Sequence, residues 1–335
     1  MNTLAVCLKC FLLAVLTLLW IGCGDEDQRQ NERSDDASGA DQATPPPANV
    51  PDFDADSAYA YIEKQLSFGP RVPNTAAHVA CAQWLMAKLD SFGATVITQP
   101  AVVQAFDGTA LNMVNIIGAY HPESQRRIML SAHWDTRPFA DEDDERQDEP
   151  IPGANDGASG VAVLLEIARQ FAQQDPGLGV DIVFWDAEDY GKSEVRDSYC
   201  LGAQYWARNK HVPGYEAMWG INLDMVGAPN ARFTREGQSM QYAPQVVDRV
   251  WRTASLLGYG QYFSSLRTDG IIDDHVYVSR LGGVPMIDII DQPSGQRFFE
   301  HWHTHEDDLD AISRETLKAV GQTVLTVVYQ MGVGG

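Results

Sequence analysis

The sequence lacks the clusters of basic residues that a nucleic-acid-binding protein needs. Its 335 residues include 24 Lys and Arg but 46 Asp and Glu, which gives a formal net charge of −22 at pH 7. Contacts to phosphates require Lys and Arg gathered on one surface, and no such block is present. We therefore expect no nucleic-acid partner. With 44% hydrophobic residues, the chain can nevertheless bury a sizeable core.

Two common catalytic signatures are also missing. No Gly-x-Ser-x-Gly elbow is present, so the sequence does not predict a serine nucleophile of the hydrolase type. The glycine-rich segment 153–160 has no lysine of a phosphate-binding loop, and the nearby acidic residues would repel a phosphate. The chemistry must therefore come from other residues.

The hydrophobic run near the N-terminus is too short to cross a membrane. Residues 10–21 form an uncharged run of about twelve residues, against the ~20 that a spanning helix needs. Such a run is typical of a secretory signal. It is followed by Gly22, Cys23 and a strongly polar stretch, which resembles a bacterial lipoprotein signal with Cys23 as the lipid-modified residue. An ordinary secretory signal with an incidental cysteine is the alternative.

We predict a signal peptide over residues 1–22 and an acidic, proline-rich, disordered tether over residues 23–51. The tether is rich in Asp, Glu, Gln, Ser, Ala and Pro, a composition that buries too little apolar area to order itself. The protein is then exported, either to the periplasm or as a membrane-anchored lipoprotein. Of the five cysteines, only Cys81 and Cys200 fall in the remaining body, where they either pair or stay as two buried thiols.

Residues 52–335 show the alternation of helices and strands that is typical of a single α/β domain. Helices are predicted where apolar residues recur every three to four positions, over residues 57–66, 75–92, 160–173, 244–257 and 314–330. Strands are predicted at short apolar runs, over residues 113–120, 127–133, 180–186, 218–225 and 285–290. We therefore expect a mixed, mostly parallel central sheet covered by helices on both faces.

Ionisable residues follow the predicted strands at the points where the strands end. They are His133 and Asp135, then Asp186, Glu188 and Asp189, then Asp224, and finally His301, His303 and His305. Asp156 lies in a loop of small residues that opens helix 160–173, where it has the alternative role of capping the helix. Ligands of such sheets gather at the carboxyl ends of the strands, so the whole set favours a metal site built from Asp, Glu and His.

Zinc is the metal that suits these residue types best. A catalytic zinc ion takes three protein ligands from imidazoles and carboxylates and keeps one position open. A separate carboxylate must lie nearby to move a proton. The neighbours Glu188 and Asp189 can supply both functions, because adjacent side chains leave the backbone in different directions.

The sequence resembles the zinc-dependent M28 peptidase-like family, and within it the bacterial glutaminyl-peptide cyclotransferases. The resemblance covers nearly everything from residue 52 onwards. The motifs that carry it are His133-Trp134-Asp135, Gly153-Ala154-Asn155-Asp156, Asp186-Ala187-Glu188-Asp189, Leu223-Asp224 and Trp302-His303-Thr304. Segments 68–73, 224–230 and 273–275 are similar to the cyclotransferase branch.

The resemblance implies a role for each matching residue. The implied zinc ligands are Asp156, Asp189 and His303, the general acid/base is Glu188, the groups around the leaving nitrogen are Asp224 and Asp273, and Trp302 is a wall of the substrate pocket. The implied reaction converts the N-terminal glutamine of a peptide to pyroglutamate and releases ammonia, with one zinc ion in a monomer. Asp189 stands where many members carry Glu. His305, beside Glu306 and Asp307, is expected to be a solvated, charge-paired residue.

The main alternative is a di-zinc M28 aminopeptidase that releases N-terminal residues. In that enzyme His133 and Asp224 would complete a second metal site, with Asp156 bridging the two ions. Alternatively, His133 and Asp135 support the first site without binding metal. A non-catalytic binding protein on the same scaffold would have lost Glu188 or a ligand, and no such loss is present.

Overall fold

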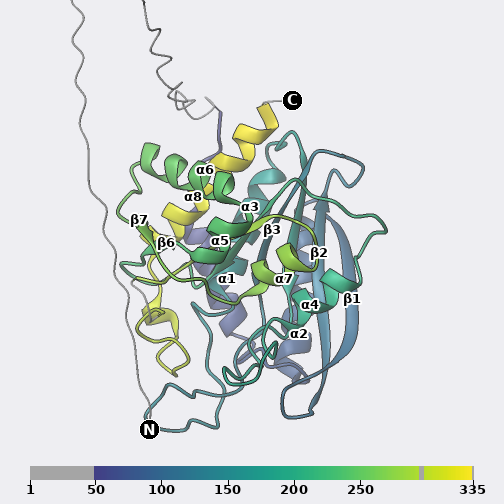
Figure 1. Ribbon diagram of the computed structural model, residues 1–335, viewed down its shortest axis with the longest axis vertical. Coiled ribbons are helices and arrows are strands. Elements are labelled where there is room, and N and C mark those ends of the chain that lie inside the picture. Colours follow the sequence, from purple (N-terminus) through teal and green to yellow (C-terminus); the bar gives the residue numbers. More distant parts are fainter. Residues whose placement is uncertain (1–48, 294–297, 334–335) are drawn as a thin grey trace, which may run out of the picture. The chain divides into compact units, whose positions relative to one another are not determined.

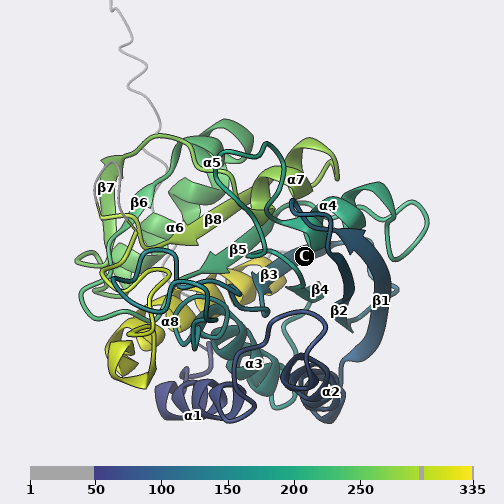
Figure 2. The same ribbon diagram turned by 90° about the horizontal axis from the view of Figure 1, so that it is seen from below.

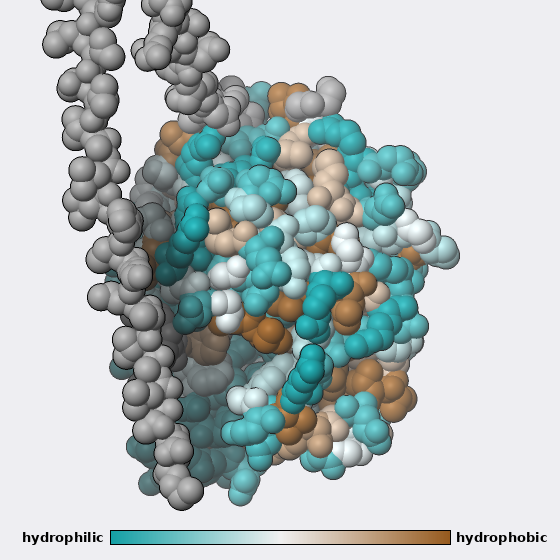
Figure 3. Space-filling view, in the orientation of Figure 1, coloured by the Kyte–Doolittle hydropathy of each residue, from teal (hydrophilic) through white to brown (hydrophobic). Residues whose placement is uncertain are grey.

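A computed structural model of the chain describes residues 49–293 and 298–333. The predicted signal peptide, Cys23 and nearly all of the predicted tether lie outside the described residues. Within them, no helix combines the length and the hydrophobicity needed to cross a membrane. The face seen in Figure 3 is mainly hydrophilic, with hydrophobic residues scattered among the polar ones.

A six-stranded sheet with the order β1-β2-β4-β3-β5-β8 forms the centre of the domain (Figure 1). Its strands are β1 (Thr95–Gln104), β2 (Ala110–Tyr120), β3 (Arg127–His133), β4 (Gly179–Trp185), β5 (Gly220–Asp224) and β8 (Met286–Ile290). Strand β2 pairs antiparallel with both β1 and β4, whereas β4, β3, β5 and β8 run parallel. The prediction of a mixed, mostly parallel sheet is confirmed.

Helices cover both faces of this sheet. They are α1 (Ala55–Leu66), α2 (Ala76–Ser91), α3 (Ser159–Phe171), α4 (Leu201–Arg208), α5 (Gly237–Tyr242), α6 (Pro244–Leu256), α7 (Asp274–Arg280) and α8 (Arg314–Val333). Figure 2 shows α1, α2 and α3 on one side of the sheet and α4, α5 and α7 on the other. A 3₁₀ turn (Leu309–Ala311) precedes α8, and a separate two-stranded sheet joins β6 (Phe233–Arg235) and β7 (Phe263–Arg267).

Two hydrophobic cores hold these layers together, because successive side chains of a strand point to opposite faces. In β3, Ile128 and Leu130 belong to the larger core, which also contains residues of α1, α3 and α8. Met129 belongs to the second core, with Trp206 of α4 and Tyr277 of α7. Every residue of β3 is buried, as expected for a strand that is covered on both faces.

The elements that the sequence did not predict are short or lie at the edges. Strand β1 is an edge strand that pairs with β2, and it contains Pro100, which an edge position tolerates. Helices α4 and α7 have eight and seven residues, too few for a clear helical period. Cys81 and Cys200 are both buried and free, so they do not pair.

The start of α3 lies unusually close to the carboxyl ends of two strands. A Cβ atom added to Gly160 would lie 2.3 Å from the carbonyl oxygen of Leu223 and 2.9 Å from the Cβ of Ala132. Real side chains do not come this close, so only glycine allows the contact. It brings the loop that precedes α3 against the ends of β3 and β5.

We expect Gly160→Ala to destabilise the protein by about 1–3 kcal/mol, because the added methyl group overpacks this contact. Helix propensity alone predicts the opposite sign, a gain of about 1 kcal/mol. Urea unfolding would measure the change. Gly260→Ala is the control, since its Cβ would have no neighbour within 4 Å, and it should change the free energy of unfolding by less than about 0.5 kcal/mol. A Gly160→Ala protein as stable as the wild type would contradict the close packing.

Candidate active site

The carboxyl ends of three neighbouring strands bring the candidate residues together. Strand β3 ends at His133, β5 ends at Asp224, and β4 ends immediately before Asp186. Because these strands are parallel neighbours, their carboxyl ends meet at one edge of the sheet. Asp156, from the loop before α3, and His303, from the segment after β8, join them there.

The first candidate metal group consists of Asp156, Asp189 and His303. One ligand atom from each lies within 4.8 Å of the others, and all three residues are buried. The Nε2 atom of His303 is 3.7 Å from Asp156 Oδ2 and 3.4 Å from Asp189 Oδ1. The Oδ2 atom of Asp189 is buried and has no hydrogen-bond partner, which suits an oxygen that binds a metal ion. Two carboxylates and one imidazole fit a zinc ion with an open position.

A salt bridge behind His303 fixes the orientation of its ring. The backbone of His303 has a φ of 58°, which is uncommon for a residue other than glycine and typical of constrained sites. Its Nδ1 atom lies 3.2 Å from Asp141, and Arg137 donates two hydrogen bonds of 2.7 and 2.6 Å to the same carboxylate. A carboxylate behind a ligating histidine orients the ring and raises its basicity.

The charges around His303 favour a cation at this position. Burial alone would lower the pKa of His303, but the negative charge of Asp189 and the contact with Asp141 raise it to about 9. Partial burial would raise the pKa of Asp141, but its hydrogen bonds with Arg137 and His303 have the larger effect and lower it. The site therefore attracts positive charge, whether a proton or a metal ion.

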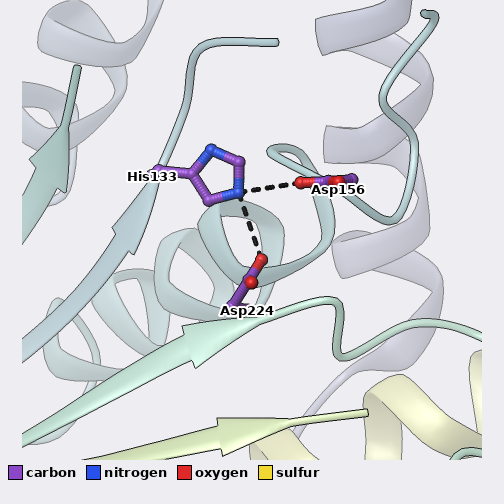
Figure 4. Close-up of side chains that lie close together, drawn as sticks. All are labelled: His133, Asp156 and Asp224. Atoms are coloured by element: carbon purple, nitrogen blue, oxygen red, sulfur yellow. Dashed lines mark hydrogen bonds and ion pairs between the residues drawn. The ribbon is translucent and has the colours of Figure 1, made fainter. Parts of the chain in front are cut away.

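The second candidate metal group consists of His133, Asp156 and Asp224 (Figure 4). The Nε2 atom of His133 lies 3.1 Å from Asp156 Oδ1 and 3.1 Å from Asp224 Oδ1. Although burial opposes it, contacts with Asp135, Asp156 and Asp224 raise the pKa of His133 well above its ordinary value. Asp156 belongs to both groups, so it occupies the bridging position that a two-metal site would need.

Asp135 holds the loop that carries Glu188 and Asp189. Its fully buried carboxylate accepts hydrogen bonds from the backbone N–H groups of Glu188, at 3.0 Å, and Asp189, at 3.2 Å. It belongs to none of the four groups of described residues that could hold a metal ion, the two candidate groups above included. The preceding Ala187 has a φ of 52°, so the chain turns sharply just before the two acidic residues.

Glu188 lies beside Asp273 and is not part of the first metal group. A carboxylate oxygen of Glu188 lies within 4.8 Å of one from Asp273. Burial raises the pKa of Glu188 well above its ordinary value, and the negative charges of Asp189, Asp274 and Asp273 add to this effect against the opposing influence of His133. A carboxyl group whose pKa is raised in this way can act as a general acid and base.

These residues line one pocket with a volume of 260 Å³. Its lining residues are Asp156, Glu188, Asp189, Ser193, Tyr199, Asp224, Met225, Ile271, Ile272, Asp273, Ile290, Phe298, Trp302 and His303. The ring of Trp302 stacks on the ring of His303, with 3.6 Å between the ring centroids, and its centroid lies 4.8 Å from that of Phe298. None of the lining residues is Lys or Arg, so the pocket combines apolar residues with acidic ones.

Asp224 and Asp273, the other two acidic residues of the pocket, each contact a polar side chain. Burial raises the pKa of Asp224 to about 7, despite its contact with His133. Asp273 caps the start of α7, and its Oδ2 atom accepts a 2.8 Å hydrogen bond from the side chain of Asn222. Both groups line the same pocket as Glu188 without forming part of the first metal group.

The loop that carries Asp156 is anchored by two residues from distant parts of the chain. Asp307 accepts hydrogen bonds from the backbone N–H groups of Asn155, at 2.7 Å, and Asp156, at 3.0 Å. The buried Arg71 donates two 2.6 Å bonds to the carbonyl groups of Pro152 and Gly153. Asp156 does not cap α3, whose N-cap is Ala158 with no side-chain hydrogen bond. The capping alternative is therefore wrong.

Sequence reasoning missed three residues near the site and described His305 only in part. His305 is charge-paired as predicted, with Asp143 at 2.7 Å, but its side chain is only 15% exposed rather than solvated. The supporting residues Arg137, Asp141 and Asp307 were not predicted. Asp141 and Asp307 lie within acidic stretches, where nothing in the sequence separates a buried carboxylate from an exposed one.

The chain is an α/β domain with buried Asp, Glu and His residues at the carboxyl edge of its sheet. Its fold is that of the zinc-dependent exopeptidases. The chain matches peptidase family M28 over residues 115–328. Because this match covers more than half of the chain, the protein belongs to peptidase family M28.

Similar proteins in this family carry two kinds of name. A glutaminyl cyclase of Bacteroides thetaiotaomicron is 54% identical, with a TM-score of 0.82 over 84% of this chain and 99% of that structure. A leucine aminopeptidase precursor of the same species is also 54% identical, with a TM-score of 0.81 over 84% of this chain and 98% of that structure. Bovine glutaminyl-peptide cyclotransferase is 26% identical over 245 residues, or 64% of this chain. The alignment covers 65% of the length of the bovine protein, and it covers 44% of the length of aminopeptidase YwaD of Bacillus subtilis.

We expect Asp156→Ala and His303→Ala to lose bound zinc, because each removes one of the three predicted ligands. Mass spectrometry of the dialysed protein would give the zinc content, and circular dichroism would show whether the fold is retained. His305→Ala is the control, since this nearby histidine contacts Asp143 and belongs to neither metal group. It should bind zinc like the wild type. Full zinc content in folded Asp156→Ala and His303→Ala proteins would disprove the assignment.

Proposed function

We propose that this protein is a zinc-dependent glutaminyl-peptide cyclotransferase, which converts N-terminal glutaminyl residues of peptides to pyroglutamate and releases ammonia. The observation that carries the proposal is the position of Asp273. This carboxyl group lies beside Glu188 in the lining of the pocket, outside the first metal group. A primary carboxamide needs such a group, because its nitrogen must be held by a hydrogen-bond acceptor before it departs.

The pocket suits the side chain of glutamine. Its apolar wall, which includes Ile271, Ile290 and Trp302, would pack against the two methylene groups. Its lining includes five acidic residues and no Lys or Arg, so a neutral carboxamide is accepted more readily than the carboxylate of glutamate. Buried polar groups discriminate strongly between ligands that do and do not satisfy them.

The first metal group supports the zinc dependence of this reaction. A zinc ion held by Asp156, Asp189 and His303 supplies a Lewis acid for the carboxamide oxygen. Bovine glutaminyl-peptide cyclotransferase and the cyclase of Bacteroides thetaiotaomicron are named for this activity. We propose one zinc ion per chain.

Glu188 moves the proton in this mechanism. The α-amino nitrogen of the substrate attacks its own γ-carboxamide carbon, so the entropy of bringing the two groups together is largely removed by their connection. Glu188 accepts a proton from this nitrogen and delivers it to the departing nitrogen as the carbon–nitrogen bond breaks. The products are a lactam ring and ammonia. The raised pKa of Glu188 suits both steps.

Asp224 and Asp273 hold the leaving nitrogen. Both line the pocket beside Glu188. Since burial raises the pKa of Asp224 to about 7, this carboxyl group can hold a proton near neutral pH while its other oxygen accepts a hydrogen bond. Asp273 lines the pocket and is kept in place by a hydrogen bond from the side chain of Asn222.

The second candidate function is a di-zinc aminopeptidase. The group formed by His133, Asp156 and Asp224 favours it, because Asp156 is shared with the first metal group. A structure at 54% identity is named a leucine aminopeptidase precursor. The reaction would then be hydrolysis of the first peptide bond, for which Asp273 has no evident role.

Export belongs to the same proposal. The apolar run over residues 10–21 and Cys23 support secretion with a lipid anchor at Cys23, and the tether would hold the enzyme away from the membrane. Both candidate metal groups are built from residues of one chain, so a monomer is sufficient for activity.

We expect the purified chain to release ammonia from a peptide with N-terminal glutamine and to bind one zinc ion. The products are followed by an ammonia assay and by mass spectrometry of the peptide. The control is the same peptide with N-terminal leucine, which the cyclotransferase leaves unchanged because it has no side-chain amide. Release of free leucine together with two zinc ions per chain would instead support the aminopeptidase.

We expect Glu188→Gln to lower kcat by about 10²–10⁴-fold, the usual contribution of general acid–base catalysis, while zinc stays bound. Steady-state ammonia release and zinc analysis would test both parts. Glu194→Gln makes the same chemical change at an exposed position of the loop that follows β4, and it should leave kcat unchanged. Near-normal turnover by Glu188→Gln would contradict the assignment of Glu188 as the general acid/base.

A further inference from the structure

The side chain of Cys200 contacts Glu188, the residue on which the proposed reaction depends. Its Sγ atom lies 3.2 Å from Glu188 Oε1, with the thiol as donor. Cys200 is fully buried and free. Its Sγ atom and carboxylate oxygens of Glu188 and Asp273 all lie within 4.8 Å of one another. We infer that Cys200 is a positioning residue, whose thiol orients the carboxyl group of Glu188 toward the substrate.

Backbone hydrogen bonds hold Cys200 beside Glu188. The Cys200 φ of 59° and ψ of 36° are left-handed, a conformation that is uncommon for residues other than glycine and persists where the surroundings enforce it. Its N–H group donates a 2.8 Å hydrogen bond to the carbonyl oxygen of Glu188, and Leu201 donates one of 3.0 Å to Ala187. Residues 189–199 thus form a loop that is closed at Glu188 itself.

The position of the thiol is set by the second hydrophobic core. Cys200 belongs to this core together with Trp185 at the end of β4 and Ala203 and Trp206 of α4. These residues are fully buried, so the thiol has little freedom to move away from Glu188. A side chain fixed by packing can orient a neighbouring catalytic group, which loosely held groups cannot do.

A thiol provides orientation with a weak hydrogen bond. Burial and the negative charge of Glu188 raise the pKa of the Cys200 thiol well above its ordinary value, so the thiol keeps its proton and remains a donor. Thiols are weak donors, and the carboxylate that accepts from one keeps most of its basicity. In the described part of the chain, no other hydrogen bond to the Glu188 carboxyl group is seen, which leaves the rest of its bonding capacity for the substrate.

This inference rests on the proposed function, and it predicts a selective kinetic defect. In the full chain, Cys200→Ala should lower kcat for ammonia release by about tenfold and change KM by less than about twofold, because the donor orients the proton-transferring group. Cys200→Ser should recover most of the lost turnover, since a hydroxyl group also donates. Zinc content should stay at the wild-type value in both variants.

Cys81 supplies the matched control. It is the other free cysteine of the described residues, it is equally buried, and it lies in α2. Cys81→Ala should leave kcat and KM unchanged. Equal losses of kcat in Cys200→Ala and Cys200→Ser, or losses accompanied by loss of zinc, would show that Cys200 acts only through packing and would overturn the inference.

A spectroscopic measurement separates this inference from the proposed function. The infrared difference spectrum between the wild type and Cys200→Ala isolates the S–H stretching band of Cys200. In Glu188→Ala this band should move to higher frequency, because the hydrogen-bond acceptor is removed. An unmoved band would overturn the inference even in an active enzyme. A wild-type protein that releases no ammonia but shows the shift would refute the proposed function and leave the contact supported.

Discussion

The carboxylate of Asp156 is the group on which the rest of the site depends. It is almost fully buried, and its two oxygens face two imidazoles, His133 at 3.1 Å and His303 at 3.7 Å. A buried charge without a partner is strongly destabilising, so this carboxylate requires imidazolium groups or metal ions around it. The glycine contact at the start of α3 and the backbone hydrogen bonds to Asp307 place it between them.

The two acidic residues that follow the turn at Ala187 have different surroundings. Directly after this residue, Asp189 contributes to the metal group and Glu188 contributes to the pocket beside Asp273. Asp135 holds the backbone N–H groups of both acids, while Cys200 binds the carbonyl and carboxyl groups of Glu188. The residues proposed to bind the metal and to transfer the proton are therefore neighbours in sequence: Asp135 supports both, and Cys200 contacts Glu188.

The candidate site could be predicted from the sequence to the extent that it depends on strand ends. The apolar run 127–133 coincides with β3, and an ionisable residue at the end of a parallel strand must lie near those of the neighbouring strands. The predicted residues Asp156, Glu188, Asp189, Asp224, Asp273, Trp302 and His303 all line one pocket. Strand β1 and helices α4 and α7 were not predicted, because an edge position or a short length weakens the periodic signal.

The sequence by itself therefore determined the α/β class, the main strands and the residue types of the centre, since these follow from local hydrophobic patterns and motifs. Only the tertiary structure decided which partner each polar side chain has. Asp141 supports His303, Asp307 holds the loop of Asp156, and Cys200 contacts Glu188, although Asp307 and Asp156 are separated by 151 residues. Such contacts depend on how distant segments pack, and a local pattern records the burial of a segment but not the neighbours that packing brings to it.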